Sequence, residues 1–151
     1  MANDLKEKLT AFLTELTGAM GLSLQVKLED HPDHTRVDLE GRGGEVLLRR
    51  KGEALDAVQH IVNTAFRRGP EDSHHFVVDC LGYRKNKEAE LRQMTQYLIE
   101  RAKGTREPQE IGPLNPFHRR LVHLQVAEDP GVSSESVGDA FMKTVIISVK
   151  K

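Results

Sequence analysis

The spacing of hydrophobic residues changes abruptly near Gly21, from steps of three and four residues to alternate positions. Before Gly21 the apolar residues recur with the period of one helix face: Leu5, Leu9, Phe12, Leu13, Leu16 and Met20. After it, apolar and polar residues alternate over residues 22–28, which predicts a strand with one buried face. A helix that leads directly into a half-buried strand favours an α+β fold.

The pattern predicts four more elements before Gly82. A turn at residues 30–34 should return the chain into a second strand antiparallel to the first. The predicted elements are this second strand, a short helix, a longer helix and a third strand: residues 35–40, 46–48, 55–66 and 76–80. The first half therefore has the order αββααβ.

The rest of the chain predicts two helices and three short strands. In the order helix, strand, helix, strand, strand they lie near residues 84–103, 110–111, 115–128, 132–137 and 144–149. The second helix has a clear start, because Asn115 suits the N-cap and Pro116 the first helical position. On this helix we expect Phe117, Leu121 and Leu124 to face the core.

The charge of the chain is divided unevenly between its two halves. The 151 residues carry a formal net charge of -1, which by itself argues against a simple polyanion-binding protein. Up to Gly82, however, 10 Lys and Arg stand against 14 Asp and Glu, whereas from Tyr83 onward 12 stand against 9. An acidic first half and a basic second half place any binding of a polyanion in the second half.

Several classes of protein are disfavoured. Cys80 is the single cysteine, so a disulfide framework and a Cys-rich zinc site are excluded, and a reducing cytoplasmic setting fits best. No apolar run approaches the roughly 20 residues that span a bilayer, so we expect no membrane insertion. The histidines outside the helices lack metal-ligand spacing, and no catalytic motif stands out. We therefore expect no metal, no cofactor and no enzymatic activity.

Arg119 and His123 form the sharpest candidate site. Four residues apart on a helix, they project from one face and lie one turn apart. A guanidinium binds phosphate oxygens in a bidentate way, and an imidazole can donate a second hydrogen bond. Arg120 adds a cation next to them, and Arg84 and Lys85 form a basic cluster that can extend the surface. The alternative is an ordinary solvated helix face.

The segment around this pair resembles a known family. Residues 115–124, Asn-Pro-Phe-His-Arg-Arg-Leu-Val-His-Leu, followed by Asp-Pro-Gly-Val at 129–132, resemble the carboxy-terminal domain of the Jag (SpoIIIJ-associated) family. That domain is named R-three-H for an Arg and a His separated by three residues. Residues 81–85 are similar to the family's domain junction, and residues 51–59 to the helix after its KH loop.

The resemblance implies two small domains. Residues 1–82 are expected to form a KH-like domain of the prokaryotic type II, and residues 83–151 an R-three-H domain with helices packed on a small β-sheet. The family's amino-terminal Jag module is expected to be absent. The implied protein is a cytoplasmic bacterial binder of single-stranded nucleic acid, most readily RNA, whose Arg119 and His123 meet phosphate. Because the family is linked to control of the cell envelope and of division, the resemblance also implies a regulatory role.

The chain departs from the family at the KH loop, where Gly-x-x-Gly is replaced by Arg49, Arg50, Lys51 and Gly52. Glycines at both ends let the nucleic-acid backbone approach the main chain closely. Either the clamp is lost or charge contacts from the three cations replace it. We expect RNA binding by this domain to be weaker than in relatives with an intact loop, and Arg49→Gly to strengthen it.

Two further points remain open in the sequence. Aromatic residues are scarce, with no Trp, two Tyr and five Phe, so that Tyr83 and Phe141 are the candidates to stack on a base. The alternative function is a protein-interaction or dimerisation module, in which residues 1–82 dock another KH protein or a second copy of this chain.

Overall fold

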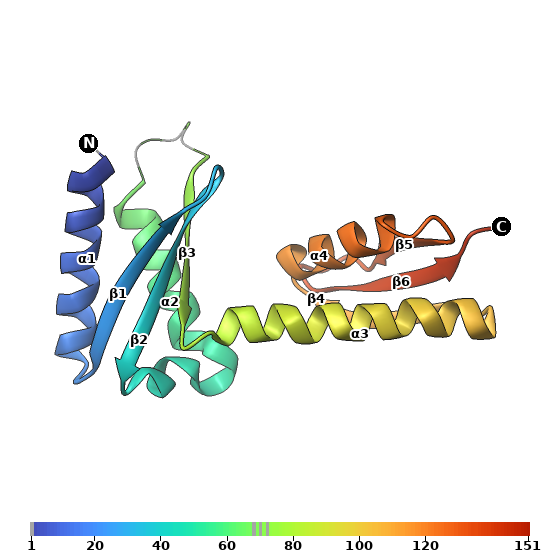
Figure 1. Cartoon of the computed structure of the whole chain (residues 1–151), viewed down its shortest axis with the longest axis horizontal. Coiled ribbons are helices and arrows are strands. Elements are labelled where there is room, and N and C mark those ends of the chain that lie inside the picture. The colour runs from blue at the N-terminus through green and yellow to red at the C-terminus, as the bar shows by residue number, and fades with distance from the viewer. Residues whose placement is uncertain (1, 68, 70, 72) are drawn as a thin grey trace. The chain divides into compact units, whose positions relative to one another are not determined.

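The computed structural model describes residues 2–67, 69, 71 and 73–151 of the chain. The chain folds into two compact units, Met1–Lys85 and Asn86–Lys151. Helices and strands build both units, and the long helix α3 (Tyr83–Thr105) begins at the end of the first unit and continues into the second (Figure 1). Among the described residues, no helix is both long enough and apolar enough to cross a membrane.

The first unit has the predicted order of elements. These are α1 (Ala2–Ala19), β1 (Ser23–Asp30), β2 (His34–Arg42), the 3₁₀ helix η1 (Gly44–Leu48), α2 (Arg49–Ala65) and β3 (His75–Cys80). The strands form one sheet in the order β1-β2-β3, in which β1 and β2 are antiparallel and β2 and β3 are parallel. The register places Val37 opposite both Leu28 and Val78, so the alternating apolar residues share one face.

The core of this unit lies between that face and its helices. α1 contributes Leu9 and Leu13, and α2 contributes Leu55 and Val62, all fully buried. The four-residue step from Leu9 to Leu13 and the seven-residue step from Leu55 to Val62 each place the pair on one side of its helix. Cys80 is also fully buried, and its thiol donates to the carbonyl oxygen of Gly44 at 3.5 Å.

The second unit is built on an antiparallel sheet. Its elements are α3 (Tyr83–Thr105), β4 (Gln109–Leu114), α4 (Pro116–Ala127), β5 (Val132–Val137) and β6 (Lys143–Val149). The strand order is β4-β6-β5, so β6 is central and β5 and β6 form a hairpin. Both helices and all three strands contribute side chains to its core: Leu98, Ile99, Ala102, Val122, Val126, Ile111, Val132, Val145 and Ile147. The α+β fold class, with a helix-and-strand unit followed by helices on a small sheet, is confirmed.

The predicted inward face of α4 is wrong. Phe117 and Leu124 are 52% and 55% exposed, whereas Val122 and Val126 are fully buried. The helix carries apolar residues on two faces, and its own periodicity does not choose between them. Packing against the sheet selects the valine face, because short β-branched side chains allow α4 to approach the strands closely.

Candidate nucleic-acid interface

The start of α4 is fixed by its cap. The side-chain oxygen of Asn115 accepts a hydrogen bond from the backbone N–H of His118 at 2.8 Å, and Pro116 occupies the first turn. This satisfies one of the free N–H groups at the helix start, as the sequence predicts. Arg119 and His123 come three residues before Val122 and Val126, so both lie at the edge of the buried face.

His123 is held by two serines of β5. Its Nδ1 lies 2.6 Å from the Oγ of Ser134, and its Nε2 lies 2.7 Å from the Oγ of Ser136. Two residues apart on a strand, the serines point to the same side of the sheet. Both ring nitrogens therefore have hydroxyl partners, and the imidazole joins α4 to β5 in a fixed orientation. The site predicted from the sequence does not include these two serines. Their spacing, two residues apart on a predicted strand, is the signal that could have identified them.

Arg119 lies one turn earlier and contacts the loop beyond β5. Its Nη2 donates to the backbone carbonyl oxygen of Phe141 at 3.2 Å. Its Nε is buried and has no hydrogen-bond partner among the residues that the structure describes. Because a guanidinium has five N–H donors, Arg119 retains the capacity to bind an anion. Arg120 is exposed beside it, so α4 carries Arg119, Arg120 and His123 together.

The turn that leads from α4 to β5 is pinned to α3. Lys103 Nζ lies 2.5 Å from the Oδ2 of Asp129, whose Oδ1 accepts the backbone N–H of Gly131 at 2.9 Å. The hydrogen bond from Lys103, followed by that from Gly131, lowers the pKa of Asp129 below its usual value. This anchor holds the beginning of β5, and with it the serines that contact His123.

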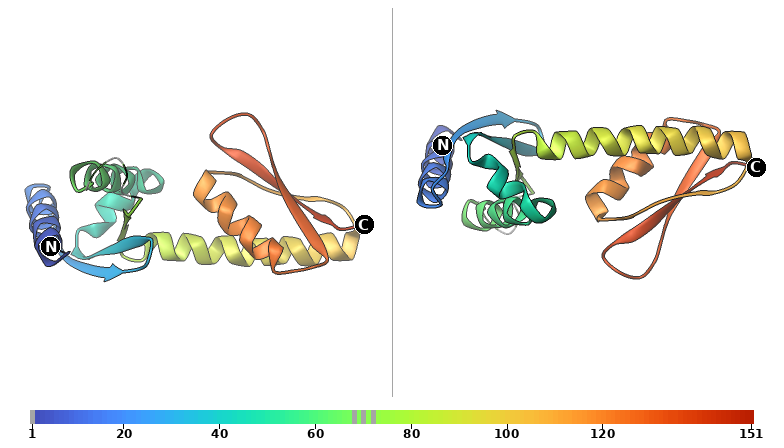
Figure 2. Two further views of the ribbon diagram at one scale, coloured as in Figure 1. Left: turned by 90° about the horizontal axis from the view of Figure 1, so that it is seen from above. Right: turned by 90° about the horizontal axis from the view of Figure 1, so that it is seen from below.

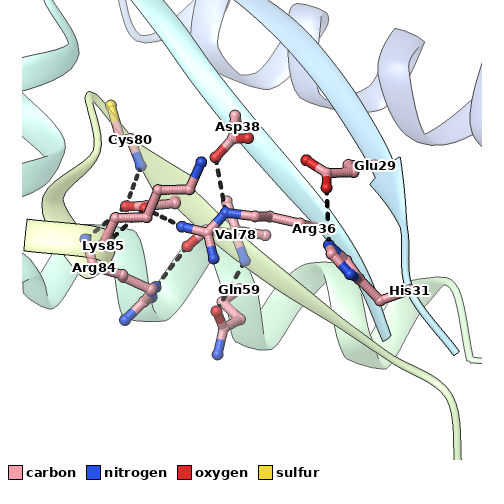
Figure 3. A network of polar contacts seen from close by, with 10 residues as sticks. Glu29, His31, Arg36, Asp38, Gln59, Val78, Cys80, Arg84 and Lys85 are labelled. Atoms are coloured by element: carbon pink, nitrogen blue, oxygen red, sulfur yellow. Dashed lines mark hydrogen bonds and ion pairs between the residues drawn. The ribbon is translucent and has the colours of Figure 1, made fainter. Parts of the chain in front are cut away.

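Arg84 has a different environment from Arg119. In the first unit its Nε donates to the carbonyl oxygen of Val78 at 2.6 Å (Figure 3). Its Nη2 lies 2.9 Å from Oδ1 of Asp56. The contact with Asp56 is an ion pair without hydrogen-bond geometry, since Nη2 makes no hydrogen bond among the described residues. Its side chain is 21% exposed. The guanidinium is thus engaged inside the unit, and Lys85 is the exposed cation of this pair.

The buried carboxylate of Asp79 explains why α3 begins here. It accepts the backbone N–H groups of Arg84 at 2.8 Å and Lys85 at 3.3 Å, and it pairs with the guanidinium of Arg36. A carboxylate at free N–H groups stabilises a helix start. Arg36 in turn lies 3.3 Å from Asp38 (Figure 3). The sequence does not single out this network, because Arg36 and Asp79 lie 43 residues apart along the chain.

The loop of Arg49, Arg50, Lys51 and Gly52 has an unusual backbone. Arg49 is extended, with φ -62° and ψ 152°, a conformation open to any residue. The next three residues are all left-handed, with φ of 52°, 58° and 76°. Gly52 is buried, and a Cβ there would lie 3.0 Å from the ring of Tyr83. Glycine is therefore required at the last position, and the three cations before it are exposed.

The histidines at the far end of the first sheet do not form a metal centre. The rings of His31 and His34 stack with centroids 4.6 Å apart, and the Nε2 of His74 lies 2.7 Å from the hydroxyl of Thr35. Among the described residues, no three His, Cys, Asp or Glu side chains are grouped so that they could hold a metal ion.

Comparison with known proteins agrees with this architecture. Residues 89–149 match the R-three-H domain, and the second unit is therefore an R-three-H domain, with Arg119 and His123 on its second helix. The chain is 26% identical over 149 residues to the RNA-binding protein KhpB of Clostridium symbiosum. It is 20% identical over 142 residues to the RNA-binding protein KhpB of Bacillus subtilis. A KhpB of Lactiplantibacillus plantarum is 18% identical over 140 residues.

These alignments cover nearly all of the chain but only part of each relative. They include 97%, 93% and 93% of the chain, and 67%, 68% and 44% of the respective KhpB proteins. The predicted resemblance to the Jag family is confirmed, and the chain is a homologue of the KhpB (Jag) proteins.

Proposed function

We propose that this protein binds single-stranded nucleic acid, RNA in the cell, through its R-three-H unit and without catalysis. The observation that carries the proposal is the state of Arg119. Its guanidinium lies at the edge of α4 and makes one hydrogen bond to the described residues, from Nη2 to Phe141, so that N–H donors at the end of the side chain remain for a phosphate. The names of the relatives, which describe RNA-binding proteins, support the same function.

The residues of the site divide into two roles. Arg119 and Arg120 supply positive charge and N–H donors for the phosphates. His123 positions the site, because its ring links α4 to Ser134 and Ser136 on β5. A phosphate oxygen can also replace one serine hydroxyl at the imidazole, which is then a direct contact.

The first unit supplies a second, weaker contact in this proposal. Arg49, Arg50 and Lys51 are exposed and can meet phosphates by charge, together with Lys85. Arg49 replaces the first glycine of the KH-loop motif, and its side chain stands where the nucleic-acid backbone would approach, so the backbone clamp of a KH loop is weakened. Arg84 is assigned to the start of α3, because its guanidinium is bound to Val78 and Asp56.

The experiment is a salt series with labelled oligonucleotides. Fluorescence anisotropy of single-stranded RNA, single-stranded DNA and duplex RNA is measured for wild type, Arg119→Ala and Arg119→Ala/His123→Ala. Each lost single-strand phosphate contact should flatten the log–log salt dependence by about 0.7. Arg101→Ala is the matched control, because it removes the same charge from an exposed position on α3. We expect a flatter slope for the Arg119 variants than for Arg101→Ala.

Equal affinity and slope in wild type and the double variant would contradict the role of α4. Retention of a protein partner after nuclease treatment, without RNA binding by the purified chain, would instead favour the interaction-module function.

A further inference from the structure

Phe141 is the most exposed large hydrophobic side chain among the described residues. It is 72% exposed and lies in the loop that joins β5 to β6, next to Met142, which is 46% exposed. Figure 2 shows this loop projecting from the second unit. A single exposed apolar side chain needs no explanation, but an aromatic ring on a projecting loop beside a cation does.

The backbone of Phe141 is bonded directly to the proposed phosphate site. The carbonyl oxygen of Phe141 accepts the hydrogen bond from Nη2 of Arg119, so the guanidinium and the aromatic residue are immediate neighbours. This bond also limits the movement of the loop at the residue that carries the ring. Along the hairpin, His123 contacts Ser134 and Ser136, and Arg119 contacts Phe141 farther on. The contacts thus form a row that ends at the backbone of Phe141, the residue that carries the exposed ring.

A second exposed aromatic residue lies at the same end of the sheet. Phe117, in the first turn of α4, is 52% exposed, and its ring centroid lies 5.7 Å from that of His118. The register pairs Leu114, three residues before Phe117, with Lys143, two residues after Phe141. The start of α4 and the start of β6 therefore border the same region.

We propose that Phe141 is a stacking platform for a nucleobase whose flanking phosphate is bound by Arg119. This inference rests on the proposed function and names the part of the ligand that the R-three-H unit contacts besides phosphate. Proteins that bind single strands combine cations that follow the backbone with aromatic rings on which bases stack. A protein partner is less well matched, because the neighbouring cations Arg119 and Arg120 outnumber the single acidic residue of the loop, Asp139.

Stacking on one ring discriminates little between bases, because every base has a π-face. The platform therefore favours an unpaired base without specifying its identity. It also excludes duplexes, in which the faces of the bases are covered by their neighbours.

The absence of tryptophan from the chain allows a direct optical test. Phe141→Trp introduces the single tryptophan of the chain at the platform, and oligo(U) and oligo(A) RNA should quench its emission. An oligomer of abasic ribose phosphates of equal length should not, since it offers the same charges but no base to stack. Tyr97→Trp is the matched control, because Tyr97 is 59% exposed on α3 and lies outside the row of contacts. We expect little quenching at that position with either oligomer.

The affinity test uses the full chain and Phe141→Ala. Loss of a stacked base should weaken binding of oligo(U) about 5- to 150-fold, the equivalent of ~1–3 kcal/mol. The salt slope should stay that of wild type, and binding of the abasic oligomer should be unchanged. Circular dichroism checks that the variant is folded.

The outcomes separate this inference from the proposed function. Suppose that the salt dependence of RNA binding by wild type depends on Arg119, but Phe141→Ala binds RNA as tightly as wild type. The stacking role of Phe141 is then wrong, and the phosphate site at Arg119 stands. If wild type binds no single strand, both are wrong. If Phe141→Ala changes self-association in sedimentation and leaves RNA affinity intact, Phe141 is a protein contact and the platform is again overturned.

Discussion

At the scale of single residues, surroundings determine what an arginine is free to do. The Nε of Arg84 is bound to the carbonyl oxygen of Val78, whereas the Nε of Arg119 has no hydrogen-bond partner among the described residues. A buried carbonyl that loses its donor destabilises the fold, whereas Arg119, which makes one hydrogen bond to the described residues, from Nη2 to Phe141, keeps N–H donors for a ligand. We therefore expect substitution of Arg84 to change the free energy of unfolding, and substitution of Arg119 to change the affinity for RNA.

We predict that Arg84→Ala lowers the free energy of unfolding by about 1–3 kcal/mol, because it removes a hydrogen bond from a charged donor. Urea denaturation measures this change. Asp56→Asn is the control, since its ion pair with Arg84 is made at a carboxylate that is 65% exposed and should contribute less than about 1 kcal/mol. Equal destabilisation by both substitutions would show that the ion pair, not the contact with Val78, holds Arg84.

At the scale of elements, the loop of residues 49–52 at the start of α2 holds two residues other than glycine in the left-handed backbone conformation. Arg50 and Lys51 have positive φ, although neither has the short polar side chain that tolerates it. Arg49, at the position of the first glycine of the KH-loop motif, has an extended backbone that needs no glycine. Thus the replaced glycine and the strained residues are different positions of the same loop.

Glycine substitutions along this loop should have opposite effects on stability. Lys51→Gly should raise the free energy of unfolding by about 1 kcal/mol, because it relieves a left-handed conformation. Arg49→Gly should lower it by roughly 0.5–1 kcal/mol, because glycine loses more backbone entropy on folding. Urea denaturation of the two variants, each with one cation removed, gives the comparison. Stabilisation by Arg49→Gly would contradict the backbone assignment.

The RNA affinity of the same variants tests the loop as a binding element. We expect Arg49→Gly to strengthen binding of single-stranded RNA, because removal of the side chain lets the nucleic-acid backbone approach the chain. Lys51→Gly should weaken it slightly, since a cation is lost without opening that approach. An unchanged or reduced affinity of Arg49→Gly would show that its charge matters more than its bulk.

At the scale of the whole molecule, the two units have separate cores. Leu55 lies in the core of the first unit and Ile99 in that of the second, and both are fully buried or nearly so. Cys80 belongs to the first core, and burial, with a smaller effect of Asp79 and Glu45, raises its thiol pKa to about 11. At pH 8 the folded thiol is therefore protonated and covered, and it reacts only when the first unit opens.

This arrangement predicts a selective effect on thiol labelling. Leu55→Ala should destabilise the first unit by roughly 2–5 kcal/mol and speed the labelling of Cys80 more than about tenfold. Ile99→Ala should destabilise the second unit by a similar amount and leave the labelling rate near that of wild type. Reaction with an aromatic disulfide reagent at pH 8 measures the rate. Equal acceleration by both variants would show that the units unfold together.

The order of elements and the start of α4 depend on local interactions and can be read from the sequence. The change of hydrophobic period near Gly21 separates α1 from β1, and the cap at Asn115 begins α4. Arg119 and His123 are four residues apart and share a face once a helix is assigned. The family resemblance depends on the same local segment.

Tertiary structure alone decided which face of α4 is buried and what each candidate side chain contacts. The choice of Val122 over Leu124 depends on packing against the sheet. The contacts of His123 with β5 and those of Arg84 with Val78 and Asp56 join side chains of one element to another. Such contacts depend on how elements pack, and packing energy is shared among many side chains rather than encoded in any short motif. The sequence alone thus determined the elements and the residue types of the site, and their packing decided which of those residues remain available to bind.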